Sequence, residues 1–222
     1  WVEEGQLLSA DSASGDRFGR AVALENDMVA VGAPEAGSNG KVYIFSQDPS
    51  GEWIEVQTIL PAESDESGMG FGSSLAMNSD YLMVGAPGGN SGNGQDTGSV
   101  YVYRRTDGQE EWSFMEQLIP LLPEPGELFG ASLGMENNRV IVGAPTHNSD
   151  RFQQAGCAYV FEINSENNWD QVAQLFPSVD GFDFRFGFDV AVKGNFALVG
   201  APQSASFAGA AFLFEKDAFG WT

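Results

Sequence analysis

Cysteine and histidine are nearly absent from this chain of 222 residues, which contains one of each. A single cysteine cannot form an internal disulfide bond, and a CxxC-type structural zinc site needs at least two. Lysine and arginine together number 10, against 31 aspartates and glutamates, so the formal net charge is −21 at pH 7. Nucleic acids and anionic membranes would repel such a chain, so we expect neither as a partner.

Long apolar runs are also missing. No stretch approaches the roughly 18 apolar residues of a membrane-spanning helix, so direct membrane insertion is not expected. No basic segment precedes an apolar one near the N-terminus, as a retained signal peptide would require. The length suits one all-β domain or a compact array of repeats.

The chain is rich in internal repetition. The pair Phe-Gly occurs four times, and Gly-Ala-Pro begins 14 residues after each of these phenylalanines. Each unit then continues with a glycine, a short aromatic segment and a tryptophan that opens another apolar-patterned segment. The Phe-Gly pairs begin at Phe18, Phe71, Phe129 and Phe186, and the Gly-Ala-Pro triplets begin at Gly32, Gly85, Gly143 and Gly200.

Each unit predicts four short strands separated by turns. The first alternates small and larger residues, which places the small side chains on one face of a crowded inner strand. The second is a continuous apolar run that ends at Gly-Ala-Pro, as in a strand buried on both faces. The third and fourth are aromatic and progressively more polar, as outer strands should be. A repeated antiparallel unit of about 50 residues with four strands indicates a β-propeller blade.

The chain is therefore predicted to be one all-β domain, 1–222, with blades at about 9–60, 61–119, 120–176 and 177–222. Residues 1–8 have the pattern of a fourth strand, and the chain ends where the last unit would begin its own fourth strand. We therefore expect a closed four-bladed ring in which the N-terminal strand completes the last blade. The alternative is an arc of a larger propeller, which would leave two apolar blade faces exposed.

These motifs resemble FG-GAP repeats, the blades of the integrin α-subunit head and of many secreted proteins. The resemblance covers essentially the whole chain. It implies a propeller for adhesion or protein–protein contact, usually without catalysis, in the extracellular space, the periplasm or an organelle lumen. The partner would be a protein, within a larger assembly where the chain serves as an accessory subunit.

Two features depart from the family pattern. Family propellers commonly have seven blades, so the larger-propeller alternative is an arc of seven. Many family blades also carry an Asp-rich calcium loop between the first two strands. Here those turns are short, as in Glu25–Asp27, and cannot supply the roughly six to eight oxygens that Ca²⁺ prefers. We expect no metal and no other cofactor.

The longer loops are predicted on one face, because successive turns of an antiparallel blade alternate between two faces. We call this the top face: Ser9–Arg17, Pro61–Gly70, Gly88–Thr97, Leu121–Leu128, Thr146–Ala155 and Pro177–Arg185. Loops on a rigid scaffold commonly carry binding sites, so the partner is expected here. The candidate contact residues are Glu63, Asp65, Glu66, Asp96, Arg151, Phe152, Asp180, Phe182, Asp183, Phe184 and Arg185.

Three single residues stand out. Asp189 occupies an inner-strand position that is small in the other units, and a buried carboxylate needs a partner or a water-filled channel. It is therefore either an axial polar or ion site or part of a structural pair. His147 is expected to be an ordinary surface histidine of a top-face loop, and Cys157 to pack as a small residue.

Two other functions remain as alternatives. A hydrolase or lyase would need converging acid–base groups, and the best cluster is Asp183, Arg185 and Asp189. A glycan-binding lectin would need the same aromatic and Asn/Asp pairs in every blade, and the loops differ between units. We therefore predict a non-catalytic interaction or scaffold module.

Overall fold

The computed structural model describes residues 2–3, 5–61, 69–89, 96–105, 111–149, 152–179, 181–204 and 208–221. Within these ranges the strands form four antiparallel sheets of four strands each, in chain order. The first two sheets contain β1 (Ala21–Glu25), β2 (Met28–Ala33), β3 (Lys41–Gln47) and β4 (Trp53–Ile59), then β5 (Ser74–Met77), β6 (Tyr81–Ala86), β7 (Ser99–Arg105) and β8 (Trp112–Leu118). The last two contain β9 (Ser132–Glu136), β10 (Arg139–Ala144), β11 (Cys157–Ile163) and β12 (Trp169–Leu175), then β13 (Asp189–Lys193), β14 (Phe196–Ala201), β15 (Ala210–Asp217) and β16 (Gly220–Trp221).

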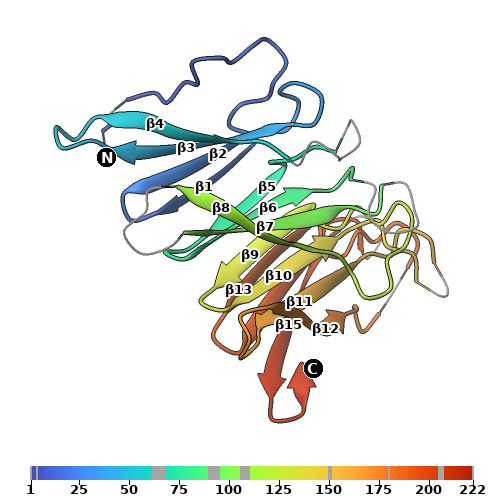
Figure 1. Ribbon diagram of the computed structural model, residues 1–222. Helices are drawn as coiled ribbons and strands as arrows, with labels where there is room; N and C mark the ends of the chain where they lie inside the picture. The colour runs from blue at the N-terminus through green and yellow to red at the C-terminus, as the bar shows by residue number, and fades with distance from the viewer. Residues whose placement is uncertain are drawn as a thin grey trace.

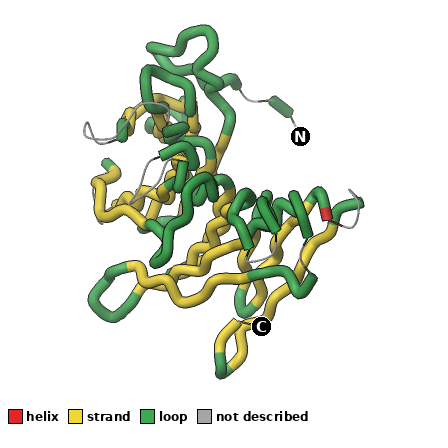
Figure 2. The backbone as a smooth tube through the Cα atoms, turned by 90° about the vertical axis from the view of Figure 1, so that its right-hand side faces the viewer, coloured by secondary structure: helices red, strands yellow, loops and turns green. Residues whose placement is uncertain are grey.

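The sheets stand side by side as the blades of a β-propeller (Figure 1). The inner strands β1, β5 and β9 are neighbours in that order, and β13 lies against β9. Apart from a single helical residue, the described chain is strand and loop (Figure 2). The predicted all-β propeller of four-stranded blades is confirmed. No helix of the described residues is long and apolar enough to cross a membrane.

The phenylalanine of each Phe-Gly pair anchors the core of its own blade. The Phe71 ring packs against the ring of Tyr101 at 5.4 Å between centroids and against that of Tyr103 at 6.3 Å. Phe129 and Phe186 make the equivalent pair of aromatic contacts with β11 and β15. Edge-to-face pairs of this kind stabilise by about 0.5–1.5 kcal/mol beyond the area that they bury.

Glycines set the spacing between neighbouring blades. The Cα of Gly143 lies so close to the carbonyl oxygen of Gly187 in the next blade that an added Cβ would overlap it. Gly32 and Gly85 approach the following blade in the same way. The Gly-Ala-Pro and Phe-Gly motifs therefore recur together because one blade's glycine receives the backbone of the next blade's Phe-Gly corner.

Hydrogen bonds confirm that the top-face loops share one end of the blades. In the first three blades, the loop that leads into the Phe-Gly corner bonds to the loop after Gly-Ala-Pro in the same blade. The N–H of Gly88 donates to the carbonyl of Met69 at 2.9 Å, and the N–H of Thr146 to the carbonyl of Glu127 at 3.3 Å. At the opposite end the first two strands are joined by tight polar turns, one of which has Asn26 at positive φ.

The N-terminal segment does not complete the last blade, which corrects the expected role of residues 1–8. Of this segment, residues 2–3 and 5–8 form no strand, and Leu7 packs against the first blade beside Val31 and Tyr43. The outer edge of β15 instead pairs with β16. Figure 1 places the N-terminus beside the first sheet and the C-terminus beyond the fourth.

The local hairpin has a simple physical advantage. Asp217 accepts hydrogen bonds from the N–H groups of Phe219 and Gly220 at 2.7 and 3.1 Å, which closes the turn between β15 and β16. Closing so short a loop costs less chain entropy than joining the two ends of the chain. No ladder or bridge connects the first and fourth sheets among the described residues.

Candidate functional site

The inner strands of all four sheets line one central cavity of about 500 Å³. Two serines of these strands tie the second blade to the third and the third blade to the fourth. The hydroxyl of Ser74 donates to the carbonyl of Gly130 at 2.6 Å, and the hydroxyl of Ser132 donates to the carbonyl of Gly187 at 2.9 Å. These serines are small because the next blade's backbone lies against them.

Asp189 occupies the equivalent position in the fourth blade, where no following blade covers it. Its side chain is exposed on the cavity wall, and its Oδ1 accepts a hydrogen bond from the N–H of Val190 at 3.0 Å. Arg185 lines the same cavity and forms an ion pair with Asp183 at 2.9 Å. The Asp189 carboxylate is thus accessible to solvent in the cavity, and its role as an axial polar or ion site stays a prediction.

The predicted contact residues of the top face are only partly described. Glu63, Asp65, Glu66, Arg151 and Asp180 lie outside the described residues.

The described candidates divide by exposure. Phe182 is exposed, and Asp96 is exposed at the end of its loop. Phe184 is half-buried, because its ring packs against Gly181. Phe152 is about one-third exposed, and its N–H donates to the hydroxyl of Ser149 at 3.0 Å. The structure therefore leaves Phe182 as the best-presented ring of the original set.

The sequence analysis missed three exposed apolar side chains on the segments that cross the top face between blades. Leu121 and Leu122 are 74% and 83% exposed, and Val179 is also well exposed. A signal was present, because two adjacent leucines stand between Pro120 and Pro123, where no strand can continue. Together with Phe182 they give the top face of the second to fourth blades an apolar component.

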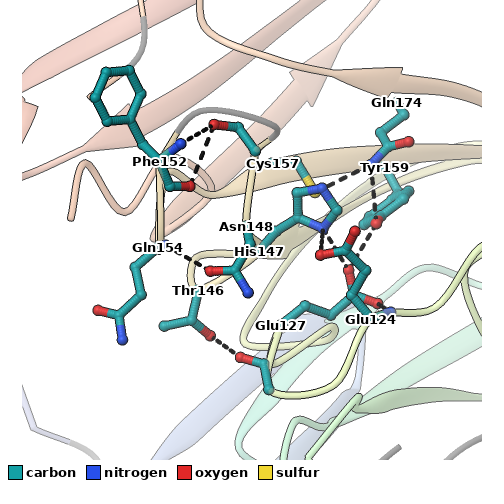
Figure 3. Close-up of polar contacts among 12 residues, drawn as sticks. Glu124, Glu127, Thr146, His147, Asn148, Phe152, Gln154, Cys157, Tyr159 and Gln174 are labelled. Atoms are coloured by element: carbon teal, nitrogen blue, oxygen red, sulfur yellow. Dashed lines mark hydrogen bonds and ion pairs between the residues drawn. The ribbon is translucent and has the colours of Figure 1, made fainter. Parts of the chain in front are cut away.

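The most unusual polar cluster is buried at the top of the third blade (Figure 3). The carboxylate of Glu127 is fully buried and lies 3.0 Å from Nδ1 of His147. The hydroxyl of Tyr159 donates to the same carboxylate at 2.8 Å. The side-chain amide of Gln174 donates to that hydroxyl at 3.1 Å and to the sulfur of Cys157 at 3.6 Å.

This geometry corrects the prediction for His147, which is 6% exposed and is not a surface residue. The physical reason is that the N–H of His147 donates to the carbonyl of Ala144 at 3.2 Å and the N–H of Gly156 donates to the carbonyl of His147 at 2.9 Å, so the loop holds the imidazole beside Glu127. Burial alone would lower the pKa of His147, but hydrogen bonds and charge from Cys157, Glu127 and Glu124 raise that pKa to about 10. The imidazole is therefore held as a cation beside the Glu127 carboxylate.

Cys157 packs as a fully buried small residue, as predicted. It also does more than fill space, because its sulfur belongs to the polar cluster. Glu127, His147 and Cys157 each place a potential metal ligand within 4.8 Å of the other two. Burial and the neighbouring Cys157 and Glu127 raise the pKa of Tyr159, which keeps its hydroxyl protonated as a donor.

The first blade fills the equivalent pocket differently. There the hydroxyl of Tyr43, the counterpart of Tyr159, donates to Asp11 at 2.8 Å, and Nζ of Lys41 pairs with Asp11 at 2.6 Å. The hydrogen bond from Lys41 is the main reason that the pKa of Asp11 is lowered. An ordinary ion pair thus takes the place of the Glu–His–Cys cluster.

Comparison with known proteins identifies the repeat. The family model described as the FG-GAP repeat matches residues 1–45, 53–103 and 169–214, which is more than half of the chain. None of the curated proteins is significantly similar. The crystal structure of Saccharomyces cerevisiae Sqt1 is similar with a TM-score of 0.48 and 13% identity, over 83% of this chain and 42% of that one. The chain therefore spans less than half the length of that protein.

Proposed function

Because this chain belongs to the FG-GAP repeat family, we propose that it is a non-catalytic module that binds a protein partner through its top face. Propellers of such repeats are interaction modules at a general level. The finer proposal concerns which surface is used. It takes its support from the apolar side chains presented by the segments that cross between blades.

The observation that carries this proposal is the exposure of Leu121 and Leu122. These side chains sit on a segment that is anchored at both sides. The N–H of Leu121 donates to Oε1 of Gln171 in the next blade at 2.9 Å, and Glu127 holds the other end of the segment in the core. Apolar groups held rigidly in water favour association, because binding removes them from water without a large ordering cost.

The charge of the molecule indicates the kind of partner. The chain has an excess of 21 negative charges, and the top face contributes Asp96 and Glu124 at its rim. Exposed apolar side chains together with acidic ones suit a protein surface that offers apolar anchors and lysines or arginines. Rim charges of this type speed association, so binding should weaken as salt rises.

The proposal also states that the chain is not an enzyme and that it lies outside the cytosol. Membership of the FG-GAP repeat family supports a role in binding rather than catalysis. Family membership and the acidic composition support a place outside the cytosol, in the extracellular space, the periplasm or an organelle lumen. Immunolocalisation in the native source tests this, and a cytosolic signal would contradict it.

The binding proposal is tested by comparing two variants in a quantitative pull-down from the native source. The double variant Leu121→Ser/Leu122→Ser removes the apolar anchors of the top face. The control is Phe219→Ser. Phe219 is at least as exposed as the two leucines, but it lies in the β15–β16 hairpin, at the end of the blades opposite to the top face. We expect specific partners to be lost from the double variant and retained by the control. Equal retention by both variants would refute binding through this face.

A further inference from the structure

We propose that Glu127, His147 and Cys157 form a binding site for a transition-metal ion of the zinc type. The three residues come from separate segments: the loop before β9, the loop after β10 and the first residue of β11. All three are buried, and their ligand atoms lie within 4.8 Å of one another. Carboxylate, imidazole and thiolate are the three ligand types that Zn²⁺ uses in proteins.

The spacing is close to what such an ion needs. With bonds of about 2.0–2.3 Å, the ligands of a tetrahedral zinc ion stand about 3.5 Å apart. Nδ1 of His147 and the carboxylate of Glu127 are 3.0 Å apart, so they would separate slightly, and the widest pair would close by about an ångström. Small side-chain rotations suffice, because the backbone already brings the three segments together.

Glu124 supplies both a fourth ligand and an entry path. Its carboxylate lies 3.7 Å from Nδ1 of His147, and its side chain is 43% exposed. The other three ligands are enclosed, so an ion would arrive from solvent past Glu124. With Glu124, four protein side chains would complete the coordination of the ion, as in structural zinc sites, and would leave no open position for a substrate.

The chemistry of the three groups suits a dipositive ion. Zn²⁺ is bound by carboxylate, neutral imidazole and thiolate, and the negative charge of the carboxylate and thiolate ligands offsets the charge of the ion.

The blade itself does not require this cluster. In the second blade the positions of Glu127, His147 and Cys157 hold Met69, Gly89 and Ser99. In the fourth blade they hold Phe184, Ser204 and Ala210. Since buried ionic groups can often be replaced by apolar ones without loss of stability, the polar set in the third blade calls for a function beyond packing.

The test uses the composition of the chain. Its one cysteine is Cys157 and its one histidine is His147, so every thiolate or imidazole signal has a known origin. Titrating the chelator-treated protein with Co²⁺ should produce a thiolate-to-cobalt charge-transfer absorption at one equivalent, and Zn²⁺ should displace it. Cys157→Ala, which copies Ala210, should abolish the band and weaken Zn²⁺ binding by more than about 100-fold.

The control is Asp11→Asn, which disturbs the equivalent pocket of the first blade and should leave the cobalt spectrum and the zinc affinity unchanged. Circular dichroism establishes that each variant is folded. Two results would overturn the proposal. One is a folded wild-type protein that shows no charge-transfer band, and the other is Zn²⁺ binding of undiminished affinity in Cys157→Ala, which would mean binding by surface carboxylates only.

Discussion

A methyl group added at Gly143 should destabilise the protein severely, and the same change at Gly200 should not. In Gly143→Ala the new Cβ would overlap the carbonyl oxygen of Gly187 and the hydroxyl of Ser132. At Gly200 the nearest atom is the carbonyl oxygen of Asp189, at 3.5 Å. Neither glycine has a positive φ, so backbone strain does not enter the comparison.

The magnitude follows from two effects at Gly143. Overpacking of a close contact costs about 1–3 kcal/mol. Pushing Ser132 away breaks its 2.9 Å hydrogen bond to the Gly187 carbonyl, and a buried acceptor left without a partner costs a further 1–3 kcal/mol or so. The free energy of unfolding should therefore fall by about 2–6 kcal/mol. Gly200→Ala should raise it by about 0.4–1 kcal/mol, because alanine restricts the unfolded chain.

Urea denaturation followed by tryptophan fluorescence measures both values. The slope with denaturant should be unchanged, so that a shift of the midpoint reports stability directly. If the two substitutions shift the free energy of unfolding equally, then contact between blades is not the reason for the glycine, and the argument fails.

Three further predictions concern single side chains. The pKa of His147 is raised from 6.5 to about 10, so the stability that it contributes is full below pH 6.5 and is lost as the pH rises toward 10. In the chelator-treated protein its NMR signals should stay those of an imidazolium at pH 8, and titration near pH 6.5 would contradict the buried pair. Tyr159→Phe removes a 2.8 Å hydrogen bond to Glu127 and should lower the free energy of unfolding by about 1.5–3 kcal/mol. An unchanged free energy of unfolding would contradict this hydrogen bond. Asp189→Ala should change it by less than about 0.5 kcal/mol, because the carboxylate is exposed, and a larger loss would indicate a structural ion pair.

The prediction of the blades from the sequence succeeded because the signals are local and repeated. Phe18 packs against Tyr43 of the same unit, and Gly32-Ala33-Pro34 marks the end of strand pairing, so each motif acts within one repeat. The prediction for the N-terminal segment failed because its pattern is equally compatible with packing on the first blade, where Leu7 lies. A strand pattern specifies a face to bury but not the neighbour that buries it.

The candidate site was less accessible to sequence reasoning. His147 and Glu127 are separated by 20 residues and meet through the packing of two loops, so neither residue type nor spacing indicated the contact. The flanking prolines placed Leu121 outside a strand but did not settle its exposure, because an apolar residue in a loop is buried or exposed according to what folds over it.

By itself the sequence determined the number of sheets, the order of their strands and the glycines between them, since these follow from short-range patterns that repeat in register. Only the tertiary structure decided that Glu127, His147 and Cys157 share one buried pocket, and that Leu121 and Leu122 are exposed. The reason is physical: local patterns control backbone conformation, whereas burial and charge pairing depend on which distant surfaces come together.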